Sequence, residues 1–333
     1  MVTIKDVARL AGVSISTVSR VINDSKPVSK EVREKVIEVI EETGYRPNDV
    51  ARSLVTRRSH LIGVIVNDLT SFYVSEMVKG VEEVGKMYNF DILLCSSYYD
   101  KEAQIKYLQL LDRKQAEGLI MIGYKFDEEI FDKIKKLNEP TIYFTRDIKD
   151  ENVNQVKIDT KAAMYEMTKY IIKSGHKKLL YAYDFNDKTT HEKEKMHGIE
   201  NAVKEDKHVS WEKIDVKGRK YKEGYNFGEN LSRKKIKFST IICSNDEIAM
   251  GLTNALFDNN VKVPEDVSVV GYGDYREGNI IRPKLTTVRE PYYDIGAVLI
   301  RNLIKEIEGE EKIDKKINLP FSIVKRDSLK VLK

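Results

Sequence analysis

The sequence is poor in cysteine and has no long apolar run. Only two of its 333 residues are cysteines, Cys95 and Cys243, and each lies in or ends a short apolar segment. Such cysteines are more often buried free thiols than disulfide partners or metal ligands. No run of 18 apolar residues occurs, and the N-terminus leads into a helical pattern with no apolar signal segment. We therefore expect a cytoplasmic protein that does not span a membrane.

Residue types that build metal and catalytic sites are also sparse. The five histidines are scattered, and the pair His191 and His197 has no more than a chance spacing for metal ligands. Gly271 and Gly273 flank Tyr272 as in a dinucleotide-binding turn, but the third glycine that would open a helix is missing. We predict that the protein is not an enzyme and uses neither a cofactor nor a metal ion.

Charged side chains are abundant. They make up 33% of the residues, beside 41% hydrophobic residues, which predicts a globular protein with a polar surface. The net charge is +4, and residues 1–60 contain 11 Lys and Arg against 8 Asp and Glu. A positive N-terminal segment is typical of a nucleic-acid-binding domain. Because this excess is small, we expect two such segments to bind together.

The first residues predict two short helices joined by a tight turn. Thr3 and Asp6 have the spacing of a capping box at the start of a helix over residues 4–11, whose apolar side chains recur every 3–4 residues. Gly12 allows the positive φ of the turn, and Ser14 can cap the second helix. The outer face of that helix carries residue types that reach base edges and phosphates, namely Ser16, Thr17, Ser19, Arg20 and Asn23.

A third helix is predicted between Ser29, as its cap, and Gly44, as its end. We expect this helix to close a small core with Val32, Val36, Ile37 and Ile40. Two short helices with a polar outer face on the second one predict a helix-turn-helix. The alternative is an ordinary helical hairpin with a solvated face.

Residues 3–8, 16–23, 44–48 and 51–54 closely resemble the LacI family of transcription regulators. The resemblance implies a headpiece, residues 1–47, that docks in the major groove. It also implies a hinge helix within residues 48–59 that folds on operator DNA, with Leu54 as an apolar wedge in a central base step. The DNA-binding residues are then expected to be Thr3, Ser14, Ser16, Thr17, Ser19, Arg20, Asn23, Tyr45, Asn48, Ala51, Arg52 and Leu54.

From residue 61, short apolar runs alternate with amphipathic helical segments. Strands are predicted at residues 61–66, 91–95, 118–122, 141–144, 178–183, 240–244 and 267–271. Helices are predicted at residues 72–88, 100–113, 127–137, 162–174, 191–204, 223–233 and 246–259. This alternation is typical of βαβ units around parallel sheets, and its repetition after about residue 160 indicates two lobes. A helix at 292–307 and a strand at 317–324 follow the second lobe.

In the family, the last segments cross back between the lobes. The resemblance therefore implies an N-terminal lobe of residues 60–159 and 290–320, and a C-terminal lobe of residues 160–289 and 321–333. The predicted fold class is α/β: an all-α helix-turn-helix headpiece with a hinge helix, followed by a two-lobed, periplasmic-binding-protein-like core of parallel sheets.

The family's usual effector, a sugar or a purine, binds between the two lobes. By resemblance, an Asp and an Arg of that site correspond to Gly273 and Lys195 in this sequence. Gly273 lacks the carboxylate that would accept two hydrogen bonds, and Lys195 lacks the planar guanidinium group of arginine. Both differences argue against the usual kind of sugar inducer. Asp274 is adjacent to the missing carboxylate. The expected cleft residues are Phe72, Tyr73, Lys195 and Asp274.

Residues 290–298, together with Arg301 and Lys305, resemble the carbon-catabolite-control branch of the family, as do residues 71–76 and 87–88. In that branch, this helix binds the phosphocarrier protein HPr when it carries a phosphoserine. Two cations beside an apolar patch suit such a ligand, although the spacing also suits a solvated helix face. The implied HPr-binding residues are Tyr88, Tyr293, Asp294, Val298, Arg301, Lys305 and Arg326.

The predicted function is that of a homodimeric, sequence-specific, DNA-binding transcription regulator, mainly a repressor. Its expected role is carbon catabolite control, with operator binding activated by serine-phosphorylated HPr. Two alternatives remain open. The first is a repressor of the same fold that a small sugar or nucleobase controls from the inter-lobe cleft. The second is a binding protein or carbohydrate enzyme with a vestigial headpiece.

Overall fold

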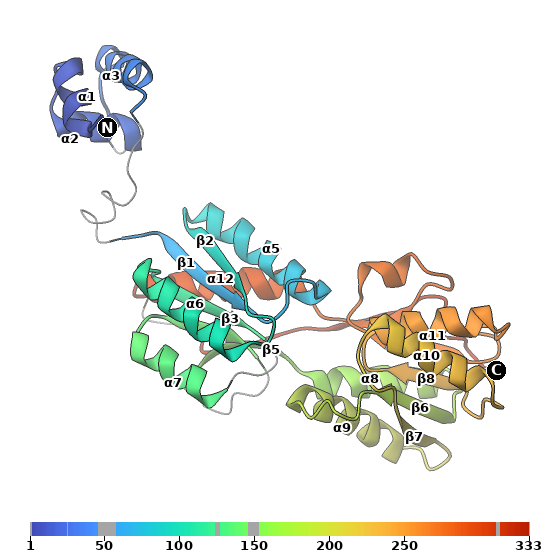
Figure 1. Cartoon of the computed structure of the whole chain (residues 1–333). Helices are drawn as coiled ribbons and strands as arrows, with labels where there is room; N and C mark the ends of the chain where they lie inside the picture. Colours follow the sequence, from blue (N-terminus) through green and yellow to red (C-terminus); the bar gives the residue numbers. More distant parts are fainter. Residues whose placement is uncertain are drawn as a thin grey trace. The chain divides into compact units, whose positions relative to one another are not determined.

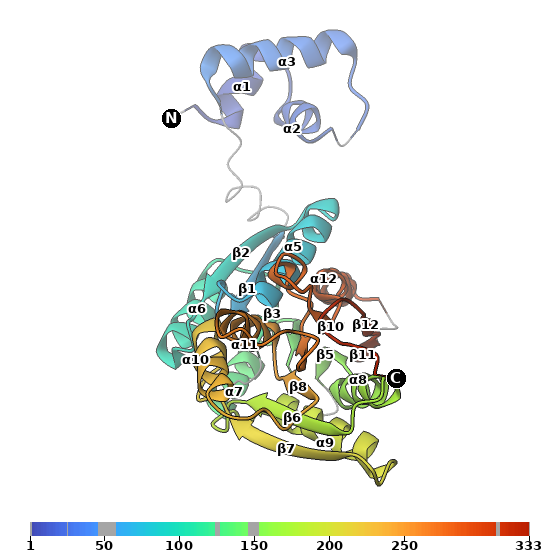
Figure 2. The same cartoon turned by 90° about the vertical axis from the view of Figure 1, so that its right-hand side faces the viewer.

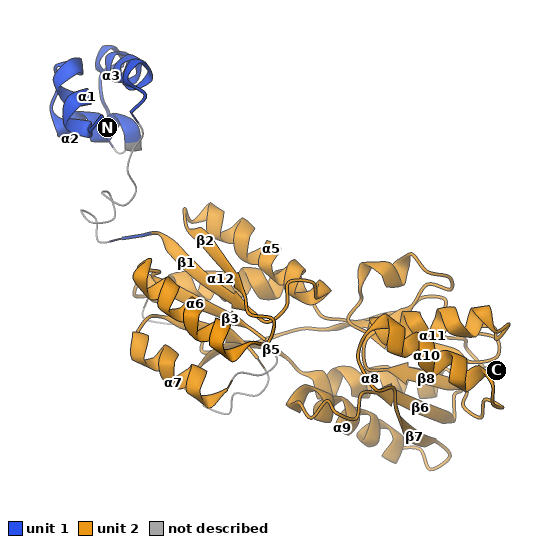
Figure 3. Cartoon of the chain, in the orientation of Figure 1, with its two compact units in different colours: residues 1–59 blue, residues 60–333 orange. Residues whose placement is uncertain are grey.

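The computed structural model describes residues 2–24, 26–45, 58–123, 127–145, 153–310 and 314–332 (Figure 1). The chain forms two compact units, residues 1–59 and 60–333 (Figure 3). The predicted hinge residues Asn48, Ala51, Arg52 and Leu54 lie outside the described residues, and so does the side chain of Asn23.

The first unit contains the three helices that we predicted, α1 (Ile4–Ala11), α2 (Ile15–Asn23) and α3 (Lys30–Thr43). The carboxylate of Asp6 accepts hydrogen bonds from the backbone N–H and the hydroxyl of Thr3, at 3.0 and 2.7 Å. Gly12 has a φ of 67° in the turn, and the Ser14 hydroxyl oxygen accepts a hydrogen bond from the N–H of Thr17 at 3.2 Å. These local contacts set the angle at which α2 leaves α1.

A small apolar core holds the three helices together. Its buried members are Val7, Ala8, Ala11, Val18, Val21, Val36 and Val39. One predicted core residue is wrong, since Ile37 is 42% exposed. Consecutive helical residues point about 100° apart, so Ile37 turns away from the stripe that Val36 and Val39 share.

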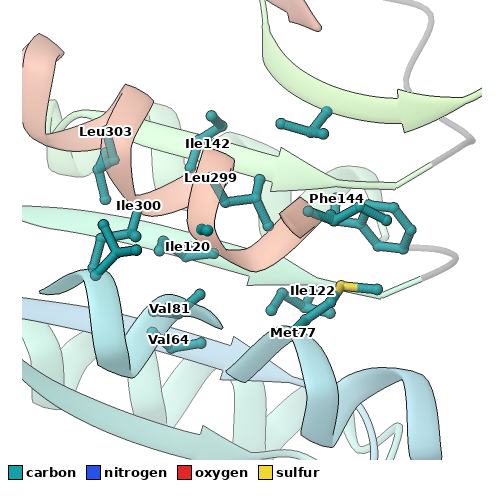
Figure 4. Packing of buried hydrophobic residues seen from close by; sticks show 14 of the residues in the cluster. Val64, Met77, Val81, Ile120, Ile122, Ile142, Phe144, Leu299, Ile300 and Leu303 are labelled. Atoms are coloured by element: carbon teal, nitrogen blue, oxygen red, sulfur yellow. The ribbon is translucent and has the colours of Figure 1, made fainter. Parts of the chain in front are cut away.

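The second unit contains two six-stranded sheets. The N-terminal lobe, or N-lobe, has strands in the order β11-β5-β4-β3-β1-β2, all parallel. Their bounds are β1 (Leu61–Val66), β2 (Asp91–Ser96), β3 (Gly118–Ile122), β4 (Thr141–Phe144), β5 (Asn154–Ile158) and β11 (Lys316–Leu319). One face packs on α5 (Phe72–Met87) and α12 (Tyr292–Ile307), as Figure 4 shows, and the other on α6 (Lys101–Arg113) and α7 (Glu128–Leu137).

The C-terminal lobe, or C-lobe, has strands in the order β12-β10-β9-β8-β6-β7, and only β12 is antiparallel among the described strands. Their bounds are β6 (Lys178–Tyr183), β7 (Ser210–Asp215), β8 (Thr240–Cys243), β9 (Ser268–Tyr272), β10 (Thr286–Arg289) and β12 (Ser322–Val324). Helices α8 (Thr160–Lys173) and α9 (Thr190–Lys204) cover one face (Figure 2). Helices α10 (Tyr221–Ser232) and α11 (Asp246–Asp258) cover the other, and the short helix η1 (Arg276–Asn279) precedes β10.

The predicted α/β fold class is confirmed, but one predicted strand is wrong. The segment expected as a single strand over residues 317–324 forms β11 in one sheet and β12 in the other. Pro320 lies between the two strands and lacks the N–H that a continuous ladder would need. The chain thus passes between the lobes after β5, after β10 and after β11.

Both cysteines are free and buried, as we predicted. Burial raises the pKa of each thiol above its usual range. In the part of the chain that the structure describes, no helix is long and apolar enough to cross a lipid bilayer.

Candidate DNA-binding and regulatory sites

The outer face of α2 presents short polar side chains. Ser16 and Arg20 are exposed, whereas Thr17 and Ser19 are half-buried. The Ser14 hydroxyl lies 2.7 Å from that of Ser16 and 2.8 Å from that of Thr17, so the three form one hydrogen-bonding cluster at the start of the helix. The first turn of α2 contains no acidic residue, which leaves the positive end of the helix dipole suited to an anion such as a phosphate.

Two other predicted contact residues lie outside α2. Thr3 is exposed, but its hydroxyl already donates to Asp6. Tyr45 is half-buried and packs against the apolar core of the first unit. The predicted contacts from the hinge, Asn48, Ala51, Arg52 and Leu54, lie outside the described residues.

Helices α5 and α12 form a second candidate site on the N-lobe. They approach so closely that a Cβ atom added to Gly296 would lie 1.9 Å from the carbonyl oxygen of Met77, and one added to Gly80 would lie 2.1 Å from that of Tyr293. The Tyr293 hydroxyl also donates a hydrogen bond of 2.6 Å to Glu83. This contact makes the two helices one packed layer, since neither backbone can shift alone without a clash or a gap.

Most of the predicted HPr-binding residues lie on this layer. Asp294 and Arg301 are exposed, Tyr293, Val298 and Lys305 are half-buried, and Tyr88, just beyond α5, is 44% exposed. The Lys305 ammonium lies 3.2 Å from the carboxylate of Glu310. Among the residues that the structure describes, Arg301 forms no ion pair.

Arg326 is placed differently from the rest of that group. It follows β12 in the C-lobe, and its guanidinium donates hydrogen bonds to Asp274 at 2.6 Å and to the carbonyl oxygen of Leu285 at 2.7 Å. Arg289 donates to the other carboxylate oxygen of Asp274 at 2.5 Å. Asp274, a predicted cleft residue, is therefore neutralised by two guanidinium groups.

The two predicted aromatic cleft residues differ in environment. The ring of Phe72 lies 5.0 Å from that of Tyr275, between centroids, and joins the start of α5 to the C-lobe. Tyr73 is only 4% exposed and packs in the N-lobe core beside Tyr292. A cavity of about 210 Å³ beside Phe72 is lined by Asp274, Arg289, Tyr293 and Asp294, among others.

Lys195 is almost fully buried, with 2% of its side chain exposed. Its ammonium donates a hydrogen bond of 2.6 Å to the carbonyl oxygen of Ser244. It also lies 3.8 Å from a carboxylate oxygen of Glu192 and 4.2 Å from the centroid of the Tyr272 ring. Burial raises the pKa of the Glu192 carboxyl, and the charge of Lys195 opposes that shift.

Sequence reasoning missed several polar residues around Lys195. The Tyr181 hydroxyl donates a hydrogen bond to Glu192, and the Tyr272 hydroxyl donates one of 2.5 Å to Glu290, just before α12. These tyrosines occur in apolar strand runs, where they resemble ordinary core residues. A nearby cavity of about 580 Å³ is lined by polar residues of the loop after β6 and by Arg219, which lies 2.9 Å from Asp187.

A buried acid at the start of α11 was also missed. Asp246 is fully buried, and its two carboxylate oxygens accept hydrogen bonds of 2.7 Å from the Thr287 hydroxyl and from the N–H of Tyr275. Burial raises its pKa from 3.8 to about 7. The run Ser244-Asn245-Asp246 after a strand indicates a helix cap. It does not predict which of these side chains is buried.

Comparison with known proteins places both units in one family. Residues 3–48 match the family described as bacterial regulatory proteins, lacI family, and residues 59–326 match the periplasmic binding proteins and sugar binding domain of LacI family. The HTH-type transcriptional regulator RegA of Clostridium saccharobutylicum is 38% identical over 98% of both chains. Catabolite control protein A of Staphylococcus xylosus is 35% identical over 99% of both chains.

The fold has solved counterparts as well. A crystal structure of the lac repressor dimer bound to operator superimposes with a TM-score of 0.85 over 99% of both chains, at 24% sequence identity. The relatives named above are transcription regulators and not enzymes, in agreement with our prediction. The chain belongs to the LacI family of bacterial DNA-binding transcription regulators.

Proposed function

We propose that the protein is a homodimeric, cytoplasmic repressor of carbon catabolite control, and that serine-phosphorylated HPr increases its affinity for operator DNA by binding to α12. The observation that carries the proposal is the pair Arg301 and Lys305, one helical turn apart on the outer side of α12. The relative catabolite control protein A, which is 35% identical over 99% of both chains, supports the same assignment.

The charges on α12 are available to a phosphate group. Arg301 is exposed. Lys305 forms an ion pair with Glu310 and with no other residue that the structure describes. Both members of that pair are more than 40% exposed, so their attraction is weak in water. A phosphoserine carries nearly two negative charges and would replace Glu310 with stronger, charge-assisted hydrogen bonds.

The surroundings of the two cations suit a protein partner rather than a free anion. Val298 is half-buried between them and Tyr293, and Met87 and Tyr88 are exposed at the end of α5, by 78% and 44%. Aromatic and methionine side chains are enriched where proteins bind each other. The α5–α12 layer therefore offers an apolar contact around a phosphate-binding centre.

On the DNA side, we propose that two headpieces read two half-sites of a pseudo-palindromic operator. Ser16, Thr17 and Arg20 are the first candidates for base and phosphate contacts, together with Asn23. The family resemblance assigns residues 48–59 to the hinge helix and Leu54 to the central wedge. The exposed apolar side chains Phe257 and Ile280, at 74% and 63%, are candidates for the contact between the two subunits.

Binding of HPr and of operator would then be coupled. If HPr stabilises the lobe arrangement in which the two hinges meet, each ligand must raise the affinity of the other by the same factor. The domain boundaries proposed for this coupling are residues 1–47 for the headpiece, 60–159 and 290–320 for the N-lobe, and 160–289 and 321–333 for the C-lobe.

The test is isothermal titration calorimetry of the full-length protein with serine-phosphorylated HPr. We expect Arg301→Ala to weaken HPr binding by roughly tenfold or more, since a charge-assisted contact to phosphate is lost. Arg113→Ala removes an exposed arginine from the end of α6, on the opposite face of the N-lobe sheet, and serves as the control. Wild-type affinity in the Arg301 variant would reject this site.

A second candidate function is control by a small sugar or nucleobase. The observation in its favour is the cavity of about 580 Å³ with a polar lining that includes Asp184, Asn186 and Arg219. Titration with sugars and purines, monitored by tyrosine fluorescence, tests this alternative. Saturable binding that changes operator affinity in the absence of HPr would favour it over the first proposal.

A further inference from the structure

The buried Lys195 lies where a parallel α/β lobe usually binds its ligand. Ligands of such folds bind outside the carboxyl ends of the strands. The ammonium group of Lys195 contacts the carbonyl oxygen of Ser244, the residue that follows β8, and the ring of Tyr272, which ends β9. Helix α9 therefore places the ammonium group of Lys195 at this edge of the C-lobe sheet.

Three of the groups that surround Lys195 are those that a bound ammonium ligand would need. They are a carbonyl acceptor at 2.6 Å, a carboxylate oxygen at 3.8 Å and the face of an aromatic ring at 4.2 Å. Lys195 and Glu192 are each only 2% exposed, so both charges are removed from water. Desolvation at that level is costly unless the charges are paired and hydrogen-bonded, as they are here.

The surrounding groups are held in place by the chain itself. Tyr181 holds Glu192, and Glu290 holds the hydroxyl of Tyr272. The depth of α9 is fixed at Gly198, where an added Cβ atom would lie 2.5 Å from the carbonyl oxygen of Lys161 on α8. The position of the lysine is thus set by packing as well as by charge.

Other polar groups at this edge are also engaged within the C-lobe. The side chain of Asn245 donates to the carbonyl oxygen of Arg219 at 3.0 Å and accepts from the N–H of Ile248 at 2.9 Å. Asp274 is paired with Arg289 and Arg326. A neutral ligand would have to break these contacts to obtain its own hydrogen bonds.

We propose that Lys195 is a resident cation that occupies the ligand position of the C-lobe, so that neutral sugars do not bind there. Its contacts replace those of an external effector. A regulatory signal must then reach the protein at another surface. The proposal does not depend on the identity of that signal, and it would remain if HPr failed to bind.

Chemical rescue tests whether the groups around Lys195 bind an ammonium ion by themselves once the lysine side chain is removed. Lys195→Ala leaves a cation-binding cavity with its partners intact, and ethylammonium, which is one carbon shorter than the removed atoms, has the N–H donors to bind in it. We expect this variant of the full-length protein to unfold at a lower temperature than the wild type. Ethylammonium chloride at about ten times its dissociation constant should then raise Tm by roughly 2 °C.

Three controls make the rescue specific. Tetramethylammonium has the charge but no N–H donor, and should not rescue at equal ionic strength. Lys195→Met fills the cavity without a charge, and should be insensitive to both ions. Lys193→Ala removes an exposed lysine from the same helix and should behave like the wild type. Absence of rescue, or equal responses in all variants, would overturn the proposal.

Two further measurements cover a variant that does not fold and the binding of sugars to the wild type. If Lys195→Ala does not fold, it is refolded from urea with and without ethylammonium. Recovery only with ethylammonium supports the proposal, and no recovery under either condition rejects it. The wild type is also heated with glucose, ribose or cellobiose at millimolar concentration. No shift in Tm is expected, and a saturable increase with any of them would show that the position is open to sugars.

Discussion

The close contact of α5 and α12 allows a stability prediction for Gly296→Ala. In an exposed helix, alanine in place of glycine stabilises by about 0.5–1 kcal/mol. Here the new methyl carbon would lie 1.9 Å from the carbonyl oxygen of Met77, 2.7 Å from its carbonyl carbon and 3.0 Å from its Cα atom. All three are backbone atoms, so no side-chain rotation can relieve the overlap.

The helices must therefore separate, by more than 1 Å if ordinary contact begins near 3.4 Å. Overpacking of this kind costs about 1–3 kcal/mol or more. The clash outweighs the helix propensity of alanine, and we expect a net loss of at least about 1 kcal/mol in the free energy of unfolding. In a protein of this size, that loss lowers Tm by roughly 1.5 °C or more. Urea unfolding monitored by circular dichroism gives the free energy directly.

A double variant tests whether the two glycines serve one contact. An added Cβ atom at Gly80 would meet the carbonyl oxygen of Tyr293 at 2.1 Å. Because either alanine opens the same gap, the cost of Gly80→Ala with Gly296→Ala should be smaller than the sum of the single costs. Glu82→Ala, at an exposed position of α5, is the control. Stability of the Gly296 variant equal to or above that of the wild type would refute the argument.

Asp246, Gly12 and the two cysteines can be tested in the same way. Asp246→Asn should remove a pH dependence of the folding stability. Burial raises the pKa of Asp246 in the folded wild type from 3.8 to about 7. The protonated acid therefore stabilises the folded state fully below pH 3.8, and this contribution is lost as the pH rises to about 7. The stability difference between wild type and variant should fall by up to about 1.4 kcal/mol per pH unit in that window, measured by urea unfolding, and a constant difference would contradict the assignment. Gly12→Ala should lower the stability of the headpiece by about 1 kcal/mol, because its φ of 67° strains any residue with a Cβ atom; an unchanged thermal transition by circular dichroism would exclude that strain. Cys95 and Cys243 should react with a thiol reagent only after unfolding, since burial raises both thiol pKa values; rapid modification of the native protein would show that one is accessible.

Local patterns in the sequence predicted much of the fold. The strands β1, β3 and β4 are continuous apolar runs, and their predicted bounds agree with the structure. The strands β5 and β7 were missed, because Asn154, Gln155 and Lys157 in one, and Glu212 and Lys213 in the other, interrupt any apolar pattern. Those strands form through pairing with neighbours and not through their own composition.

Long-range contacts explain why the candidate sites were predicted less completely. Lys195 was identified as a cleft residue by resemblance, yet its partner Ser244 lies 49 residues away in the sequence. No local pattern relates these positions, and the same is true of Asp274 and Arg326, which are 52 residues apart. Arg301 and Lys305 were easier to identify, because a helical spacing of four residues already places them on one side of α12.

We propose above all that a phosphorylated protein, and not a sugar, controls operator binding. Fluorescence anisotropy with a labelled pseudo-palindromic operator at fixed salt tests it directly, with and without serine-phosphorylated HPr. We predict that operator affinity increases about tenfold or more, equivalent to ~1.4 kcal/mol, and that unphosphorylated HPr has no effect. Unchanged affinity with the phosphorylated protein, or an affinity that responds to a sugar instead, would contradict the account.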